Sequence, residues 1–149
     1  MTVGINRQPP IRVRQTLIDS CWAATLESWS RVDSRLSTVS EAEMIQAYGE
    51  GDTGGITAAT KIPVIAARFG LRFGGFNGDA LRQYLLDHLP HSHVFCAYRR
   101  GSYSHSVLLY RLSGQHLTHV SYMDPDGGYH RWHTLDWFAA RGPMALMRK

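Results

Sequence analysis

The sequence is poor in cysteine and has no long apolar run. Its 149 residues include only two cysteines, Cys21 and Cys96, which excludes the dense disulfide framework of a small secreted protein. No run of about 18 apolar residues is present, so no membrane span is expected. The N-terminus also lacks the apolar region of a Sec signal. We therefore expect a protein made in the cytoplasm, whose export would need another route.

The positive charge is not concentrated in any one segment. The chain has 16 Lys and Arg against 12 Asp and Glu, a net charge of +4, but its arginines are scattered and form no block longer than Arg99-Arg100. Scattered arginines are typical of a solvated surface, so nucleic acid is not an expected partner. The eight histidines match no standard zinc spacing. No metal and no cofactor are expected.

The order of sequence patterns predicts an α+β fold. With 44% hydrophobic residues, the chain can bury one core, and we expect a single domain over residues 1–149 with an extended segment at 1–14. Helical patterns cover 20–32, 40–48, 58–69, 79–89 and, briefly, 135–140. Strand patterns cover 92–98, 105–112, 116–123, 129–133 and 144–147. This order predicts an N-terminal helical layer packed on a C-terminal antiparallel sheet.

Three residues have the chemistry of a nucleophilic site. Cys21 falls in the first turn of a predicted helix, where the positive end of the helix dipole favours the thiolate. His105 begins a predicted strand after a turn rich in glycine and serine, and Asp124 ends the next strand just before a proline. Adjacent antiparallel strands would bring His105 and Asp124 together, so that the carboxylate orients the imidazole. The sequence predicts Cys21 as nucleophile, His105 as base and Asp124 as orienting group.

Other residues could add to this site or take the role of one of its members. The side-chain amide of Gln15, six residues before Cys21, could join the Cys21 backbone N–H in an oxyanion hole. Asp126 competes with Asp124, but its place after the proline favours a role in the turn. The candidate residues of a substrate groove are Trp22, Ser104 and Trp132. Each cysteine could instead be a packing residue, and for Cys96, inside VFCAY, we predict packing.

These residues resemble the signature of papain-like cysteine proteases. The motif Gln15 to Ser20-Cys21-Trp22, with the later His105 and Asp124-Pro125 segments, is similar to compact bacterial members, including the C39-like and AvrRpt2-like effector groups. The resemblance spans about residues 15–138. It implies a papain-like fold with Cys21 as nucleophile, His105 as general base and acid, and Gln15 as oxyanion donor. It departs from the larger enzymes because the histidine lies only 84 positions after the cysteine and the third member is aspartate.

The resemblance implies a cysteine endopeptidase, and two other functions remain open. We expect a bacterial effector or toxin domain, delivered by a specialised secretion system, that cleaves an intracellular protein and is neutralised by an inhibitory immunity protein. The same residues would also serve a glutamine deamidase, a transglutaminase or a peptidoglycan amidase, because all of these form a thioester. The third alternative is a basic binding module without activity, in which Cys21 only packs.

Overall fold

The computed structural model describes residues 3–4, 9–76, 81–142 and 145–149, and it contains helices first and most strands later. The helices are α1 (Cys21–Val32), α2 (Glu41–Tyr48), α3 (Ala58–Phe69), α4 (Leu81–His88) and α5 (Leu135–Ala139). The strands are β1 (Val3–Gly4), β2 (Arg72–Phe76), β3 (Val94–Arg100), β4 (Tyr103–Ser113), β5 (His119–Asp124), β6 (Tyr129–Thr134) and β7 (Ala145–Arg148). The predicted α+β class is confirmed.

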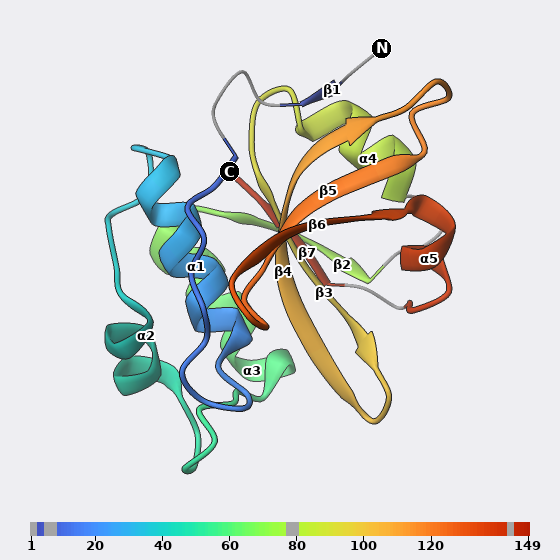
Figure 1. Ribbon diagram of the computed structural model, residues 1–149. Helices are drawn as coiled ribbons and strands as arrows, with labels where there is room; N and C mark the ends of the chain where they lie inside the picture. The colour runs from blue at the N-terminus through green and yellow to red at the C-terminus, as the bar shows by residue number, and fades with distance from the viewer. Residues whose placement is uncertain (1–2, 5–8, 77–80, 143–144) are drawn as a thin grey trace.

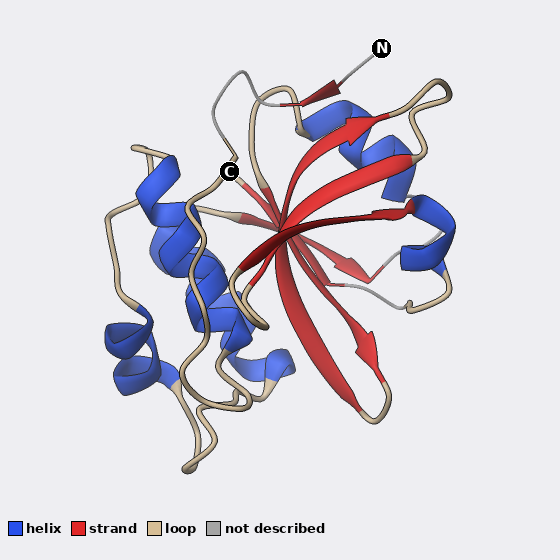
Figure 2. Cartoon of the chain, viewed as in Figure 1, coloured by secondary structure: helices blue, strands red, loops and turns tan. Residues whose placement is uncertain are grey.

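All strands join one seven-stranded antiparallel sheet (Figure 2). Its order is β2-β7-β3-β4-β5-β6, and β1 pairs separately with β4. The hairpins β3–β4, β4–β5 and β5–β6 follow the chain order, as the short predicted strands and turns require. Strand β7 returns from the C-terminus to pair with both β2 and β3. Strand β4, which carries His105, therefore lies inside the sheet between β3 and β5.

Helices cover both faces of the sheet. One face packs against α1, α2 and α3, with Phe95, Leu108 and Met123 facing that core. The opposite face, with Val107 and Leu109, packs against α4 and α5. Figure 1 shows α1 to α3 on one side of the strands and α4 and α5 on the other. The predicted helical layer is present, and the structure adds a second, smaller layer.

Helix α1 is the buried helix that carries the cysteine. Its apolar side chains Trp22, Leu26 and Trp29 recur with helical periodicity, and each is at most 2% exposed. The indole N–H of Trp22 donates to the carbonyl of Gly54 at 2.7 Å, which links the helix to the GEGDTGG loop. The hydroxyl of Thr25 donates to the carbonyl of Ser106 on β4. The first two turns of α1 are thus fixed to both the loop and the sheet.

Some boundaries differ from the sequence-based expectation. Strand β2 was not predicted, because its Arg-Phe-Gly-Gly-Phe sequence is too rich in glycine to give a strand pattern; it forms because β7 offers it a free edge. The predicted helix start at Asp79 and strand start at Met144 lie outside the described residues. Cys96 is on β3 with no exposed surface, which confirms its predicted packing position. Among the described residues, every helix is too short or too polar to cross a membrane.

Candidate active site

Cys21 is the first residue of α1 and faces the sheet. It is a free thiol with 6% of its surface exposed. Its Sγ accepts a hydrogen bond from the backbone N–H of Ser106 on β4, at 3.4 Å. In the described part of the chain the backbone N–H of Cys21 has no acceptor, as expected for the first residue of a helix. The residue therefore offers both a thiol held by a donor and an unused N–H.

His105 and Asp124 lie against each other beside this thiol. The His105 Nε2 is 2.6 Å from Asp124 Oδ1, and both side chains are almost fully buried. The contact forms because β4 and β5 pair with Leu108 opposite Met123, so Asp124 at the end of β5 reaches back toward His105. With Nε2 engaged by the carboxylate, Nδ1 is the nitrogen that remains for the Cys21 thiol. Cysteine, histidine and aspartate therefore form one connected row.

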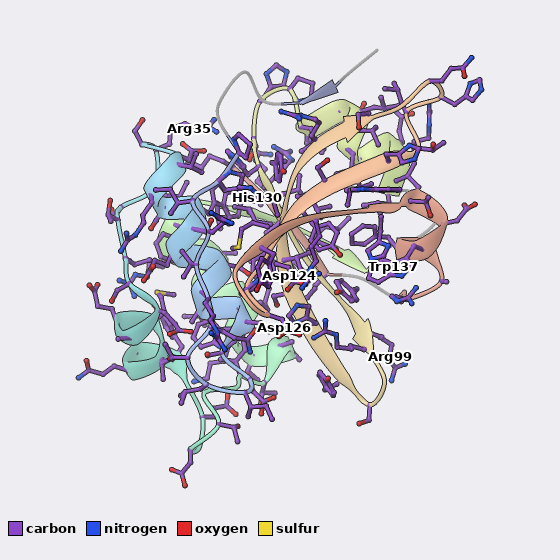
Figure 3. The ribbon with its side chains drawn as sticks, in the orientation of Figure 1. Arg35, Arg99, Asp124, Asp126, His130 and Trp137 are labelled. Atoms are coloured by element: carbon purple, nitrogen blue, oxygen red, sulfur yellow. The ribbon has the colours of Figure 1, made fainter. Side chains whose placement is uncertain are left out.

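The second oxygen of Asp124 is also engaged. Arg131 Nε lies 3.2 Å from Oδ2, and the backbone N–H of Asp126 donates to Oδ1 at 3.0 Å. Asp126, the competing candidate, points instead to the surface, where its side chain pairs with Arg100 at 3.0 Å. Figure 3 labels both aspartates at the junction between the α1 layer and the sheet. The structure therefore brings Asp124, and not Asp126, to His105.

The environment of this row favours a charged imidazole. Burial by itself would lower the pKa of His105, but its hydrogen bonds to Asp124 and Cys21, together with the negative charges of these two groups, outweigh burial and raise the pKa to about 9. Burial would likewise raise the pKa of Asp124, yet the hydrogen bond and charge of His105, the Asp126 N–H and the charge of Arg100 lower it overall. The site therefore stabilises the imidazolium form of His105 near neutral pH.

Replacing Asp124 with alanine should lower the pKa of His105 from about 9 by at least about one unit. The variant loses a hydrogen bond and a negative charge that favour the imidazolium, while most of the burial that opposes it remains. A ¹⁵N NMR titration of the imidazole between pH 5 and 11 measures the change. Asp126→Ala is the matched control, because Asp126 does not contact the imidazole. An unchanged His105 titration in Asp124→Ala would show that the carboxylate does not stabilise the cation.

Gln15 is held beside the site by a different set of contacts. Its backbone N–H donates to the carbonyl of Pro125 at 2.9 Å, which ties it to the end of β5. Its side-chain Nε2 donates to the carbonyls of Leu17 and Ile18 at 3.0 and 2.9 Å, whereas its buried Oε1 has no hydrogen-bond partner among the described residues. The amide therefore lies in the loop before Cys21, and both of its hydrogens are engaged there. An oxyanion would replace one of these neutral carbonyls as the stronger acceptor.

Two cavities meet at Cys21. The first has a volume of about 500 Å³, and the second has about 410 Å³. Both are lined by Asp19, Cys21, Tyr103 and Ser104, so these four residues mark the centre of a continuous cleft. The first cavity alone is lined by Arg14, Gln15, Thr16, Leu17, Ile18, Arg100, His105 and Asp126. The second alone is lined by Trp22, Gly55, Ile56, Ala58, Ile62, Ala97, Ser106 and Ala145.

The predicted groove residues do not all lie in this cleft. Ser104 lines both cavities, and Trp22 lines the second one although it is 2% exposed. Trp132 lines neither. It lies on β6 opposite Ser121 and is 59% exposed, with its ring next to that of His119. Strand β6 is the edge strand beyond β5, and this places Trp132 away from β4 and the cysteine.

Several residues of the site were not singled out from the sequence. Ser106 contributes through its backbone N–H, which no side-chain pattern reveals, and Arg131 reaches Asp124 from β6 through tertiary pairing. Glu41 falls within the predicted helix 40–48 with no sign of a role in the site, yet its carboxylate is buried beside the loop of Gln15. Among the described residues, no cluster of three His, Cys, Asp or Glu side chains could hold a metal ion.

A known class of protein has this fold. The helical layer, the antiparallel sheet and the cysteine at the start of α1 are those of a papain-like fold. One solved structure that the chain resembles is the crystal structure of the peptidase domain of Streptococcus ComA, a bifunctional ABC transporter involved in a quorum-sensing pathway, with a TM-score of 0.67. The match covers 93% of this chain and 97% of that domain at 20% sequence identity. No protein-family model and no curated protein matches the sequence.

Proposed function

We propose that this protein is a cysteine peptidase that uses Cys21, His105 and Asp124. The observation that carries the proposal is the His105 side chain, which hydrogen-bonds both Asp124 and Cys21 at the start of α1, in a fold shared with a peptidase domain. A packing cysteine needs none of these partners. A buried His–Asp pair with the histidine pKa raised to about 9 is, in contrast, what a thiolate nucleophile requires.

The geometry supports an acyl-transfer sequence. The Cys21 thiolate attacks a backbone carbonyl and forms a C–S bond, and the resulting oxyanion lies between the Cys21 N–H and the Gln15 amide. The His105 imidazolium then gives its proton to the leaving amine as the C–N bond breaks. The neutral imidazole takes a proton from water, which attacks the thioester; the C–S bond breaks, and the acid, the thiolate and the imidazolium are released or restored. Asp124 holds the imidazole in orientation throughout.

The two cavities differ in what they can accept. Because His105 must protonate the leaving amine, the leaving part of the substrate lies in the first cavity, which His105 lines. The acyl part then lies in the second cavity. Its own lining residues are uncharged, and four of them are glycine or alanine, namely Gly55, Ala58, Ala97 and Ala145. We therefore propose a substrate with an apolar side chain on the acyl side of the scissile bond.

Mass spectrometry of a peptide library treated with the protein tests the proposal. Hydrolysed backbone bonds that depend on Cys21 are the expected result. A gain of about one dalton at glutamine, without cleavage, would replace the peptidase by a deamidase. Glutamine–lysine cross-links would indicate a transglutaminase, and release of peptides from peptidoglycan an amidase. No covalent change in any substrate, with Cys21 reacting as an ordinary thiol, would favour the binding-module alternative.

Reversing the charge of Arg14 should reduce the cleavage of substrates with an acidic residue on the leaving side. Arg14 lines only the first cavity and, within the described residues, has no ion-pair partner, whereas Arg100 there is paired with Asp126. Because Arg14 is exposed, we expect Arg14→Glu to lower kcat/KM for glutamate-containing peptides about two- to fivefold. The effect should shrink as salt is added. Paired peptides with glutamate or glutamine on the leaving side measure it.

Arg12→Glu is the matched control for Arg14. Arg12 is also exposed, carries the same charge two residues earlier, and lines neither cavity. An equal effect of both variants would attribute the preference to net charge and not to the first cavity. No effect of Arg14→Glu would mean that the leaving side does not discriminate by charge.

The biological setting is a separate proposal that rests on the sequence resemblance alone. In it the chain is a bacterial effector or toxin domain, its substrate is an intracellular protein of the target cell, and an inhibitory immunity protein neutralises it. An inhibitor of this kind would have to cover the cleft at Cys21. Protection of Cys21 from alkylation by a co-expressed partner would support it.

A further inference from the structure

We propose that Glu41 is a positioning residue that holds the oxyanion hole in place. The inference rests on the proposed function, because it concerns the loop that carries the two proposed oxyanion donors. Gln15 and Cys21 are separated by five residues, and Glu41 hydrogen-bonds the residue that follows the first donor and the residue that precedes the second. One carboxylate therefore links both ends of the loop.

Among the described residues, the hydrogen bonds that the Glu41 carboxylate accepts all come from this loop. Its Oε2 accepts the backbone N–H of Thr16 at 2.9 Å and the hydroxyl of Ser20 at 2.9 Å, and its Oε1 accepts the hydroxyl of Thr16 at 2.6 Å. Its own backbone N–H donates to Glu27 on α1 at 2.8 Å. Glu41 is 6% exposed. The carboxylate is buried against three donors, and the hydrogen bond from its backbone on α2 to Glu27 on α1 holds the residue in place.

Ordinary roles of an acidic residue at this position do not explain these contacts. A glutamate in the first turn of a helix usually interacts with the helix dipole from the surface, and capping of α2 is performed by Ser40, whose hydroxyl accepts the Glu43 N–H. Ser20, at the N-cap position of α1, gives no side-chain cap to its own helix. Its hydroxyl bonds the Glu41 carboxylate and the Leu17 backbone instead. The side chains of Glu41 and Ser20 therefore stabilise the conformation of the loop.

The shape of this loop decides where the two donors point. The Gln15 backbone is fixed to Pro125 on the sheet side, so Glu41 supplies the opposing attachment from the helical side. Without it, Thr16 loses two hydrogen bonds and Ser20 loses one, while the attachment to Pro125 remains. The Gln15 amide and the Cys21 N–H would then no longer be held at a fixed separation. A displacement of about 1 Å can reduce the rate roughly 100-fold.

The test compares two reactions of Cys21, of which only one forms an oxyanion. Alkylation by iodoacetamide depends on the thiolate, whereas acylation by p-nitrophenyl acetate also needs an oxyanion hole. We expect Glu41→Ala to slow acylation roughly 10- to 100-fold and to leave alkylation within about twofold, because the Cys21–His105 pair is untouched. Gln15→Ala should slow acylation similarly. The double variant should be no slower than the slower single variant, because both changes remove the same function.

Glu41→Gln provides a conservative rescue. Its amide oxygen can still accept from the Thr16 N–H and Ser20, and its NH₂ can donate to the Thr16 hydroxyl, so acylation should stay within about threefold of wild type. Glu43→Ala, on the exposed side of α2, is the matched control and should change neither rate.

If Glu41→Ala does not fold, Thr16→Val provides the same test. It removes only the 2.6 Å hydrogen bond between the Thr16 hydroxyl and Glu41, so acylation should fall while alkylation does not.

The outcomes separate this inference from the proposed function. Wild-type protein that fails to acylate, with Cys21 alkylated at the rate of an ordinary thiol, would overturn the proposed function. Wild-type protein that acylates, with Glu41→Ala unchanged, would overturn the role of Glu41 alone. An equal loss of acylation and alkylation in Glu41→Ala would also overturn it, because the residue would then support the nucleophile and not the oxyanion hole. Additive losses in the double variant would do the same.

Discussion

Replacing Cys21 with alanine should abolish hydrolysis by this protein, with kcat falling by a factor on the order of 10⁵ or more. The thiol forms the covalent bond to the substrate, and among the described residues no other nucleophile lies at the start of α1 next to His105. Measurement of product formation with the best peptide from the library checks the loss. The folded state is verified by circular dichroism, because Cys21 is also a small part of the interior.

Cys96→Ala is the control for this result. Cys96 is completely buried on β3, and burial strongly raises the pKa of its thiol, so it is not available as a nucleophile. The variant should lose some stability because a small cavity is left in the core, and it should keep its activity. Residual hydrolysis in Cys21→Ala that disappears when Cys96 is also replaced would assign the reaction to the wrong thiol.

Replacing His105 with alanine should slow the acylation of Cys21 by a factor of about 10² to 10⁴. The imidazolium stabilises the thiolate and donates the proton to the leaving group, and the variant loses both functions. The loss should be largest near neutral pH and smaller at high pH. Below about pH 9 the wild-type histidine is cationic, whereas above it the imidazolium is lost in the wild type too. The rate of acylation by p-nitrophenyl acetate from pH 5 to 10 measures this difference, and iodoacetamide labelling over the same range, followed by intact mass, reports the loss of the thiolate alone.

His116→Ala is the matched control, since His116 is an exposed histidine in the β4–β5 turn and lines neither cavity. Its labelling profile should coincide with that of the wild type. A wild-type profile that follows an ordinary thiol and is indifferent to His105 would contradict the thiolate–imidazolium pair. The catalytic interpretation of Cys21 would then fail with it.

The side chains of the candidate site were the features that the sequence predicted best. Cys21, His105 and Asp124 could be singled out because each has a distinctive local context: a helix start, a strand after a turn, and a strand end before proline. Their convergence follows from the antiparallel order of β4 and β5, which the short strands already predicted. Gln15 was located by its spacing from Cys21. Its hydrogen bonds to Leu17 and Ile18, however, depend on a loop conformation that has no sequence pattern.

The remaining features depend on tertiary contacts. Strand β2 exists because β7 returns to pair with it, and the second helical layer exists because the sheet has an apolar face on both sides. Trp132 was expected in the groove because aromatic residues often line one. Its position was decided by the β5–β6 register, which places it on the edge strand. The contacts of Glu41 with Ser20 and of the Ser106 backbone with Cys21 join segments 21 and 85 positions apart in the sequence, so no local pattern predicts them.

The division of the site between two layers has a consequence for how the chain matures. Cys21 belongs to the helical layer and His105 to the sheet, 84 positions later, so the Cys21 thiol of a newly made or refolding chain does not meet His105 until the layers dock. Cys96 behaves in the opposite way, since it lies on the other face of the sheet, where packing against α4 and α5 buries it completely. Brief alkylation during refolding should therefore label both cysteines alike at first and Cys21 alone at the end. The ratio of labelled Cys96 to labelled Cys21 therefore reports how far folding has progressed, and one mass spectrum measures it.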